Sequence, residues 1–221
     1  MAEPDRPGRT IGLLAAAAVV VVTTVVLVAT LGLARPPALA AVDATTRPDR
    51  GLAVLTWRDG PGQCLLVVAP AGDVREVRCG LDAAGPLLGW DATGILVLRY
   101  VAGAEQRETV DPDTGLTVDR TALSGTSAPV PAVRLPAGAE HRDGELILRD
   151  ADGREVWRVA APDAYRIEAS ATAPDGSLAL LDTAGRLLVL PSGAAAPAVW
   201  VEDLDVGWGE LVWEGTPALR E

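Results

Sequence analysis

The chain has 221 residues and a formal net charge of −11, which allows one domain of ordinary size with an appendage. All 19 of its basic residues are arginine, and it contains neither lysine nor asparagine. These features exclude a P-loop lysine, a Schiff-base lysine and an N-glycosylation site, and they argue against a nucleic-acid partner.

The longest apolar segment comes first: residues 11–34 carry no charge. As a helix this segment would reach roughly 36 Å, enough to cross a hydrocarbon core of about 30 Å with some tilt. We therefore expect a short cytoplasmic tail over residues 1–10 and a single transmembrane helix over 11–34, ended by Arg35 and two prolines. A cleaved signal peptide is the alternative, because Ala38-Leu39-Ala40 before Ala41 fits a small-x-small cleavage pattern.

Residues 35–50 are rich in proline, alanine, threonine and aspartate and show no periodicity. We expect them to form a tether between the membrane and a domain over residues 51–221. The arginine counts on the two sides of the apolar segment do not favour a cytoplasmic N-terminus, but long domains cross a membrane largely regardless of charge.

Cys64 and Cys79 are the two cysteines of the chain, and they flank a predicted hairpin. Residues 63–69 and 74–80 have the pattern of strands around a turn at 70–73, and a symmetric hairpin places the cysteines opposite each other, within disulfide reach. A structural disulfide needs an oxidising compartment, which favours an extracytoplasmic domain. Two buried free thiols and a redox-active pair are the alternatives, although the chain has no Cys-x-x-Cys motif.

Past residue 50 the pattern is that of short strands separated by Gly, Asp and Pro turns, and no helical period persists. Five runs open with Gly, place Leu or Ala two residues later, and place Leu or Trp two residues after that. They cover residues 51–55, 94–98, 144–148, 176–180 and 209–213. An aspartate shortly before each of the first four glycines predicts a tight turn that leads into a strand.

The glycines of these runs lie 43, 50, 32 and 33 residues apart, which suits blades of three or four antiparallel strands. We therefore predict an all-β fold, a β-propeller-like domain of about four blades in a complete or incomplete ring. The blade-like units would cover 51–85, 86–123, 140–164 and 165–204, and residues 205–221 could complete the first blade. An irregular β-sandwich or barrel, in which the pattern recurs by chance, is the alternative.

The segment Asp150-Ala-Asp-Gly153-Arg-Glu-Val-Trp157 resembles the repeat of PQQ-like (quinoprotein-like) β-propellers, in which an Asp-Gly turn leads into a strand bearing Trp. Weaker copies begin at Asp111 and Asp182, and both lack the Trp. The resemblance covers about half of the domain. It implies the cofactor-free scaffold type, because the family's quinone site uses lysine, asparagine and adjacent cysteines, which this chain lacks. We therefore expect no cofactor.

His141, the single histidine, is expected as an exposed turn residue, because no serine of the chain lies in a Gly-x-Ser-x-Gly motif. Paired carboxylates such as Glu202, Asp203 and Asp205 could serve glycoside hydrolysis, but such clusters are ordinary on an acid-rich surface. We therefore predict no catalytic residue.

The turns that begin at Asp111 and Asp150 resemble the start of a calcium loop. An EF-hand loop needs Glu at position twelve, where these two segments have Ala122 and Ala161. We therefore expect hairpin turns and no metal site.

The six tryptophans supply most of the bulky packing in a chain without phenylalanine. Trp57, Trp157 and Trp213 lie in predicted strands and are expected to fill the core. Trp200, Trp208 and Trp213 lie near the C-terminus, and for them an interaction face for a partner or a glycan is the alternative to burial in the core.

The first functional hypothesis is a non-enzymatic, membrane-anchored binding or scaffold module that faces outward and binds a protein partner. The second is an enzyme, a hydrolase or lyase, on the same scaffold. The third is an accessory or sensor subunit whose transmembrane helix pairs with a larger partner, a role that the small residues of that helix permit. An exposed apolar patch would favour the first hypothesis, and a polar pocket containing His141 or a shifted acid pair would favour the second.

Overall fold

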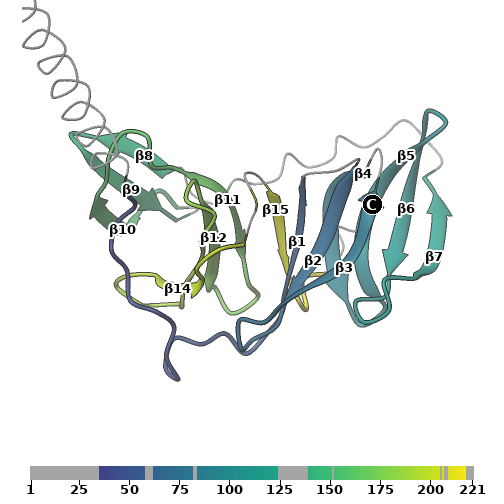
Figure 1. Ribbon diagram of the computed structural model, residues 1–221, viewed down its shortest axis with the longest axis horizontal. Helices are drawn as coiled ribbons and strands as arrows, with labels where there is room; N and C mark the ends of the chain where they lie inside the picture. Colours follow the sequence, from purple (N-terminus) through teal and green to yellow (C-terminus); the bar gives the residue numbers. More distant parts are fainter. Residues whose placement is uncertain are drawn as a thin grey trace, which may run out of the picture. The chain divides into compact units, whose positions relative to one another are not determined.

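The computed structural model describes residues 35–57, 62–81, 84–123, 139–150, 152–204, 206 and 209–217. In this part of the chain fifteen strands form four antiparallel sheets, which confirms the predicted all-β class (Figure 1). The transmembrane helix predicted over residues 11–34 lies outside the described residues. Among the residues that are described, no helix has the length and apolar character needed to cross a bilayer.

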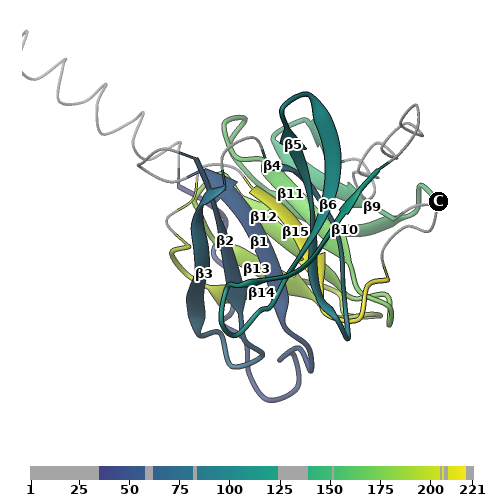
Figure 2. The same cartoon turned by 90° about the vertical axis from the view of Figure 1, so that its right-hand side faces the viewer.

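The first sheet combines the first three strands of the domain with its last strand. Its order is β15 (Gly209–Trp213), β1 (Leu52–Trp57), β2 (Gln63–Val68) and β3 (Val74–Leu81), and Figure 2 shows these strands side by side. In the pairing of β1 with β15, Leu52 lies opposite Trp213 and Thr56 opposite Gly209. The C-terminal strand therefore joins the first sheet. This matches the prediction that residues 205–221, which the repeat left over, could complete the first blade.

Each of the other three sheets is built from consecutive strands. The second contains β4 (Ala84–Asp91), β5 (Gly94–Val101), β6 (Ala104–Val110) and β7 (Thr117–Ala122). The third contains β8 (Ala139–Arg142), β9 (Glu145–Arg149) and β10 (Glu155–Ala160). The fourth contains β11 (Ile167–Thr172), β12 (Leu178–Asp182), β13 (Leu187–Leu190) and β14 (Ala198–Val201). Strands β1–β3 and the other three sheets fall within the four units that the glycine spacing predicted, to within two residues at each end. Strand β15 comes from the segment left over, residues 205–221.

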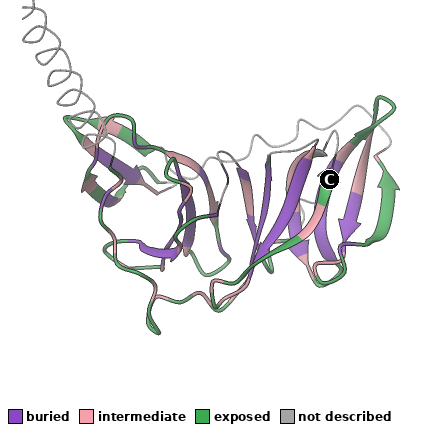
Figure 3. Ribbon diagram, in the orientation of Figure 1, coloured by how far each residue is buried: buried purple, intermediate pink, exposed green. Residues whose placement is uncertain are grey.

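The repeated glycine pattern marks equivalent places in the sheets. Four of the five runs open β1, β5, β9 and β12, each of which has a neighbouring strand on both sides, and the fifth forms β15. These four strands are largely buried (Figure 3). Gly144 and Gly176 adopt φ values of 79° and 88°, which side chains disfavour, so the glycines allow the tight turns that the sequence predicted.

Among the described residues, three apolar cores hold the sheets together. Residues such as Leu66 and Leu181 join the first sheet to the fourth, and Leu55 and Ile95 join the first to the second. A third core, which includes Leu146, joins the third sheet to the fourth. The first sheet is thus packed on both faces. None of the cores formed by described residues joins the second sheet to the third, so the described sheets do not close into a ring.

The segment predicted as a tether makes specific contacts with the fourth sheet. The Val42 N–H donates to Val199 O at 2.9 Å, and the Val199 N–H donates to Ala40 O at 2.7 Å. Leu39 packs against the core between the third and fourth sheets, and Pro37 is buried. The compact unit that holds the sheets begins at Pro37, so all but the first two residues of the predicted tether belong to the domain.

Candidate functional site

The cysteine hairpin forms the predicted disulfide. Cys64 of β2 is bonded to Cys79 of β3, with the two Cα atoms 4.0 Å apart. Cys64 is buried in the core between the first and fourth sheets, whereas Cys79 is exposed. Because the bond closes a short loop between adjacent strands, it fixes the outer edge of the first sheet to the strand that packs in the core.

The register of this hairpin differs in detail from the prediction. Residue 69 was expected opposite Val74, but Val68 takes that place, because the turn uses five residues and not four. The N–H of Ala69 donates to Asp73 O at 2.9 Å and closes this wider turn. A register shift farther along β2 then offsets the difference and brings Leu65 opposite Arg78. The cysteines consequently face each other despite the different turn.

Removal of the disulfide is expected to lower stability substantially. Replacing both cysteines (Cys64→Ser with Cys79→Ser) should lower the free energy of unfolding by about 3 kcal/mol, because the unfolded chain regains the entropy of an open loop. Urea unfolding followed by tryptophan fluorescence measures the change. Wild-type protein treated with a dithiol reductant should unfold at the same urea concentration as the double variant. Identical curves for reduced and oxidised wild-type protein would contradict the prediction.

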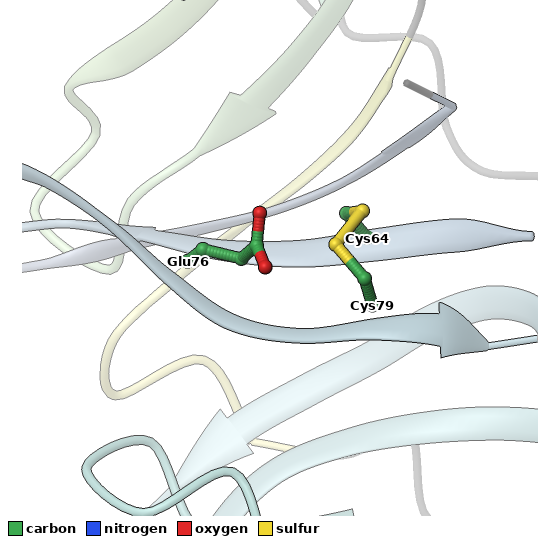
Figure 4. A group of neighbouring side chains, drawn as sticks. All are labelled: Cys64, Glu76 and Cys79. Carbon is green, nitrogen blue, oxygen red and sulfur yellow. A yellow bond between two sulfur atoms is a disulfide. The ribbon is translucent and has the colours of Figure 1, made fainter. Parts of the chain in front are cut away.

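Glu76 lies beside the disulfide, and one of its carboxylate oxygens and the two sulfurs lie within 4.8 Å of one another (Figure 4). Two thiolates and a carboxylate are ligands that zinc accepts. In the disulfide, however, the sulfurs are bonded to each other and are not thiolates, which are the form that binds metal. The oxidised hairpin therefore offers a metal only the carboxylate of Glu76.

A buried carboxylate with several arginine partners lies between the first and second sheets. Glu108 on β6 is 1% exposed, and its Oε1 accepts a hydrogen bond from Arg78 Nη1 of β3 at 2.8 Å. Thr117 Oγ1 donates to the same oxygen, and Arg120 Nη2 of β7 lies 3.4 Å from it. Arg99 Nη1 of β5 lies 3.5 Å from the other oxygen. One carboxylate thus joins strands of two sheets.

The pKa of Glu108 is lower than its ordinary value, although burial by itself would raise it. Hydrogen bonds from Thr117 and Arg78 outweigh burial, and the charges of Arg78 and Arg120 add to their effect. Glu108 is therefore ionised throughout the physiological pH range. An ionised carboxylate held by arginines is a poor general acid, so this cluster fits a structural or binding role.

A second buried polar network lies in the fourth sheet. Asp182 at the end of β12 accepts hydrogen bonds at Oδ2 from Arg186 Nε at 2.8 Å and from Tyr165 Oη at 3.1 Å. Its Oδ1 accepts the backbone N–H groups of Ala184 and Arg186, both at 2.9 Å, which closes the turn into β13. Arg186 Nη1 also donates to Pro37 O at 2.9 Å. The network therefore ties the start of the domain to its fourth sheet.

Burial raises the pKa of the Tyr165 hydroxyl, and the nearby carboxylate of Asp182 raises it further. The backbone oxygen of the same residue accepts a hydrogen bond from His141 Nε2. The structure thus holds His141 in partial burial on β8, not in the exposed turn that the sequence predicted. Within the described part of the chain, its hydrogen-bond partner is this carbonyl oxygen and not the hydroxyl of a nucleophile.

Glu210 on β15 has a raised pKa, because burial disfavours its ionised form more than its hydrogen bond supports it. That bond comes from the N–H of Leu87 on β4, at 2.8 Å to Oε2. The bond links the first and second sheets. Neither Glu108 nor Glu210 was singled out in the sequence, because each is an isolated glutamate in an ordinary strand.

A small cavity of about 140 Å³ lies between residues 45–50 and the fourth sheet, with Trp213 in its lining. Its polar lining includes Arg50, Asp175 and Ser177. Sites for drug-sized ligands usually measure at least about 300 Å³, so this cavity suits a few waters or a very small molecule.

The aspartate turns are hairpin turns, as predicted. Asp111 Oδ1 accepts the N–H groups of Asp113 and Thr114, and Asp150 Oδ1 accepts those of Asp152 and Arg154. These carboxylate oxygens are committed to their own turns, the usual role of aspartate there. Of the carboxylates weighed for hydrolysis, Glu202 and Asp203 are exposed, and Asp205 lies outside the described residues.

The described tryptophans differ in how far they are buried. Trp200 and Trp213 are buried and stacked, with ring centroids 5.5 Å apart, so they lie in the core and not on an exposed interaction face. Trp208 lies outside the described residues. Trp157 is buried as predicted, but Trp57, the last residue of β1, is 53% exposed and does not fill the core.

No family model matches this sequence. No curated protein matches it closely enough to count as a relative. A solved structure that aligns with the chain is that of a candidate 6-phosphogluconolactonase from Bacteroides uniformis ATCC 8492, with 13% identity over 69% of this chain and a TM-score of 0.21. The chain spans about half of that protein, 53% of its length. A similarity at this level carries no argument about function.

Proposed function

We propose that this protein is a membrane-anchored, extracytoplasmic binding or scaffold module, built on a β-propeller-like domain, that acts without catalysis. The observation that carries the proposal is the disulfide between Cys64 and Cys79 in an otherwise cysteine-free chain. Disulfides persist in oxidising compartments, and the uncharged segment over residues 11–34 supplies a means of reaching one while staying attached.

The order of the sheets supports the propeller-like interpretation. Each sheet after the first is a meander of consecutive strands, and β15 takes the first position in the first sheet, ahead of β1. In that position β15 lies beside β11 of the fourth sheet and β4 of the second, which are the first strands of their own sheets. Such adjacent first strands are expected if each is the inner strand of its blade, because the inner strands of neighbouring blades lie side by side. The second and third sheets would have to meet for the ring to close.

The contacts of residues 37–42 support an uncleaved anchor. Cleavage after Ala40 would remove Pro37 O from a buried guanidinium of Arg186 and Leu39 from the core beside the third sheet. A buried donor left without a partner costs about 1–3 kcal/mol. The folded domain therefore makes use of residues that a signal peptidase would discard.

The geometry of the ionisable groups supports binding over catalysis. A hydrolase that uses a side-chain nucleophile needs that group within hydrogen-bond reach of a base. Three of the described groups with shifted pKa values, Glu108, Tyr165 and Glu210, make hydrogen bonds that join separate parts of the domain. Their environments serve the packing of the domain.

Membrane extraction tests the anchor. The full-length chain is expected to stay in the membrane pellet after alkaline carbonate treatment, and its intact mass should include residues 1–40. A protease added outside the cells should digest the domain, and a thiol-directed mass tag should label it only after reduction. A mature chain that begins at Ala41, or a domain protected from external protease, would overturn the proposal.

A further inference from the structure

The cluster around Glu108 carries more positive than negative charge. Arg78 and Arg120 both pair with one carboxylate oxygen of Glu108. Two positive charges therefore face one negative charge. Arg99 brings a third guanidinium to the second oxygen. The excess is notable because the chain as a whole has a net charge of −11.

Part of this cluster reaches the surface. The side chain of Arg120 is 51% exposed and that of Arg78 is 30% exposed, whereas Glu108 is buried beneath them. Each guanidinium has five N–H donors, and Glu108 occupies only some of them. The remaining N–H groups can donate hydrogen bonds to a carboxylate from outside the domain.

Two exposed apolar residues are the chain neighbours of Thr117, which contacts Arg78. Leu116 is 67% exposed and Val118 is 60% exposed, and they stand on either side of Thr117, which accepts a hydrogen bond from Arg78 Nη1 at 3.1 Å. The whole of β7 is exposed and forms the edge of its sheet within the described residues (Figure 3). Arginine beside apolar side chains is typical of protein–protein interfaces.

We infer that this surface, the Arg78–Arg120 patch (Arg78, Leu116, Val118 and Arg120), docks an acidic segment of a protein partner. A carboxylate of the partner binds the outer faces of the two guanidiniums, and an apolar side chain beside it covers Leu116 and Val118. Glu108 holds the two arginines in place before the partner arrives, which lowers the entropy lost on binding. The inference rests on the proposed binding function and names the kind of partner.

The partner is expected to dock through its side chains and not by adding a strand to β7. The pairing of β7 with β6 shifts register between Thr109 and Val110, and β7 carries both Asp119 and Arg120. Bulges and charges on an edge strand hinder the pairing of another strand. The acidic surface elsewhere also repels an acidic segment, which confines its docking to this patch.

Fluorescence anisotropy with a labelled peptide tests the inference on the full-length chain in detergent micelles. The probe is an eight-residue peptide of alternating Glu and Leu, and empty micelles supply the background. Arg120→Gln should weaken binding about tenfold or more, since a hydrogen bond to a charged group is lost. Arg154→Gln is the matched control, because Arg154 is exposed and lies 3.3 Å from Asp152, much as Arg120 lies from Glu108. Leu116→Ser should weaken binding several-fold.

Several results would overturn the inference. They are no binding of the peptide to wild-type protein, equal binding by Arg120→Gln, and equal binding of a peptide with Gln in place of Glu. Inorganic pyrophosphate is added as a competitor; if it binds at Arg120 while the peptide does not, the patch is a site for small anions. The membrane extraction is repeated on the same cells, so failure of docking alone is distinguished from failure of the proposed anchored module.

Discussion

Glu108→Ala is expected to lower the free energy of unfolding by about 3 kcal/mol. The substitution removes the carboxylate that Arg78, Arg99 and Arg120 share and leaves three guanidiniums facing one another across the first and second sheets. Arg78 and Arg120 are partly exposed, so solvent screens their repulsion and the loss falls at the lower end for a buried pair. Urea unfolding of the full-length chain in micelles measures the change.

Glu145→Ala is the matched control for this prediction. Glu145 on β9 lies 2.7 Å from Arg158, but both side chains are well exposed, so the expected loss is below about 1 kcal/mol. A loss for Glu108→Ala no greater than that of the control would show that the cluster contributes little to stability.

The effect of Glu108 should also depend on pH in a defined direction. Its pKa in the folded protein lies below the ordinary value of 4.5, so the stability it contributes is complete above about pH 4.5. It is lost as the pH falls through the lowered pKa, because protonation removes the charge that holds the arginines. The difference between wild-type protein and Glu108→Gln should therefore shrink in acid and stay constant between about pH 5 and 8.

Local patterns predicted the elements of the fold well. The Gly-x-Leu-x-Leu runs predicted strands correctly, because alternation and turn chemistry are properties of a few adjacent residues. The cysteine pairing was also predictable, since Cys64 and Cys79 lie in one hairpin and a shift of one residue at its turn was offset by a later bulge. In both cases the information is contained within about twenty residues of the chain.

The polar networks could not be predicted in the same way. Glu108 depends on Arg78, which lies thirty residues earlier and in another sheet, and the contact exists only because the two sheets pack face to face. Arg186 binds Pro37 across a separation of 149 residues. Trp57 shows a related limit, because its place in a strand predicted burial, but it is the last residue of β1 and is 53% exposed.

Asp182→Ala is expected to cause the largest loss of stability of any single substitution proposed for this chain, about 3–5 kcal/mol. The change leaves the buried guanidinium of Arg186 without its carboxylate and the hydroxyl of Tyr165 without its acceptor. It also frees the two turn N–H groups that Oδ1 accepts. Replacing Asp182 by Asn should recover part of the loss, since the amide oxygen can still accept hydrogen bonds but carries no charge.

Asp150 provides an internal control that separates the turn from the buried network. Its Oδ1 accepts the N–H groups two and four residues later, the same pattern as Asp182, but its turn is exposed. Asp150→Ala should therefore lose only the hydrogen bonds of its turn, which lowers the free energy of unfolding by about 1 kcal/mol. The excess loss in Asp182→Ala then measures what the burial of Arg186 adds. Equal losses for the two variants would mean that the network between the fourth sheet and Pro37 contributes no stability beyond its turn.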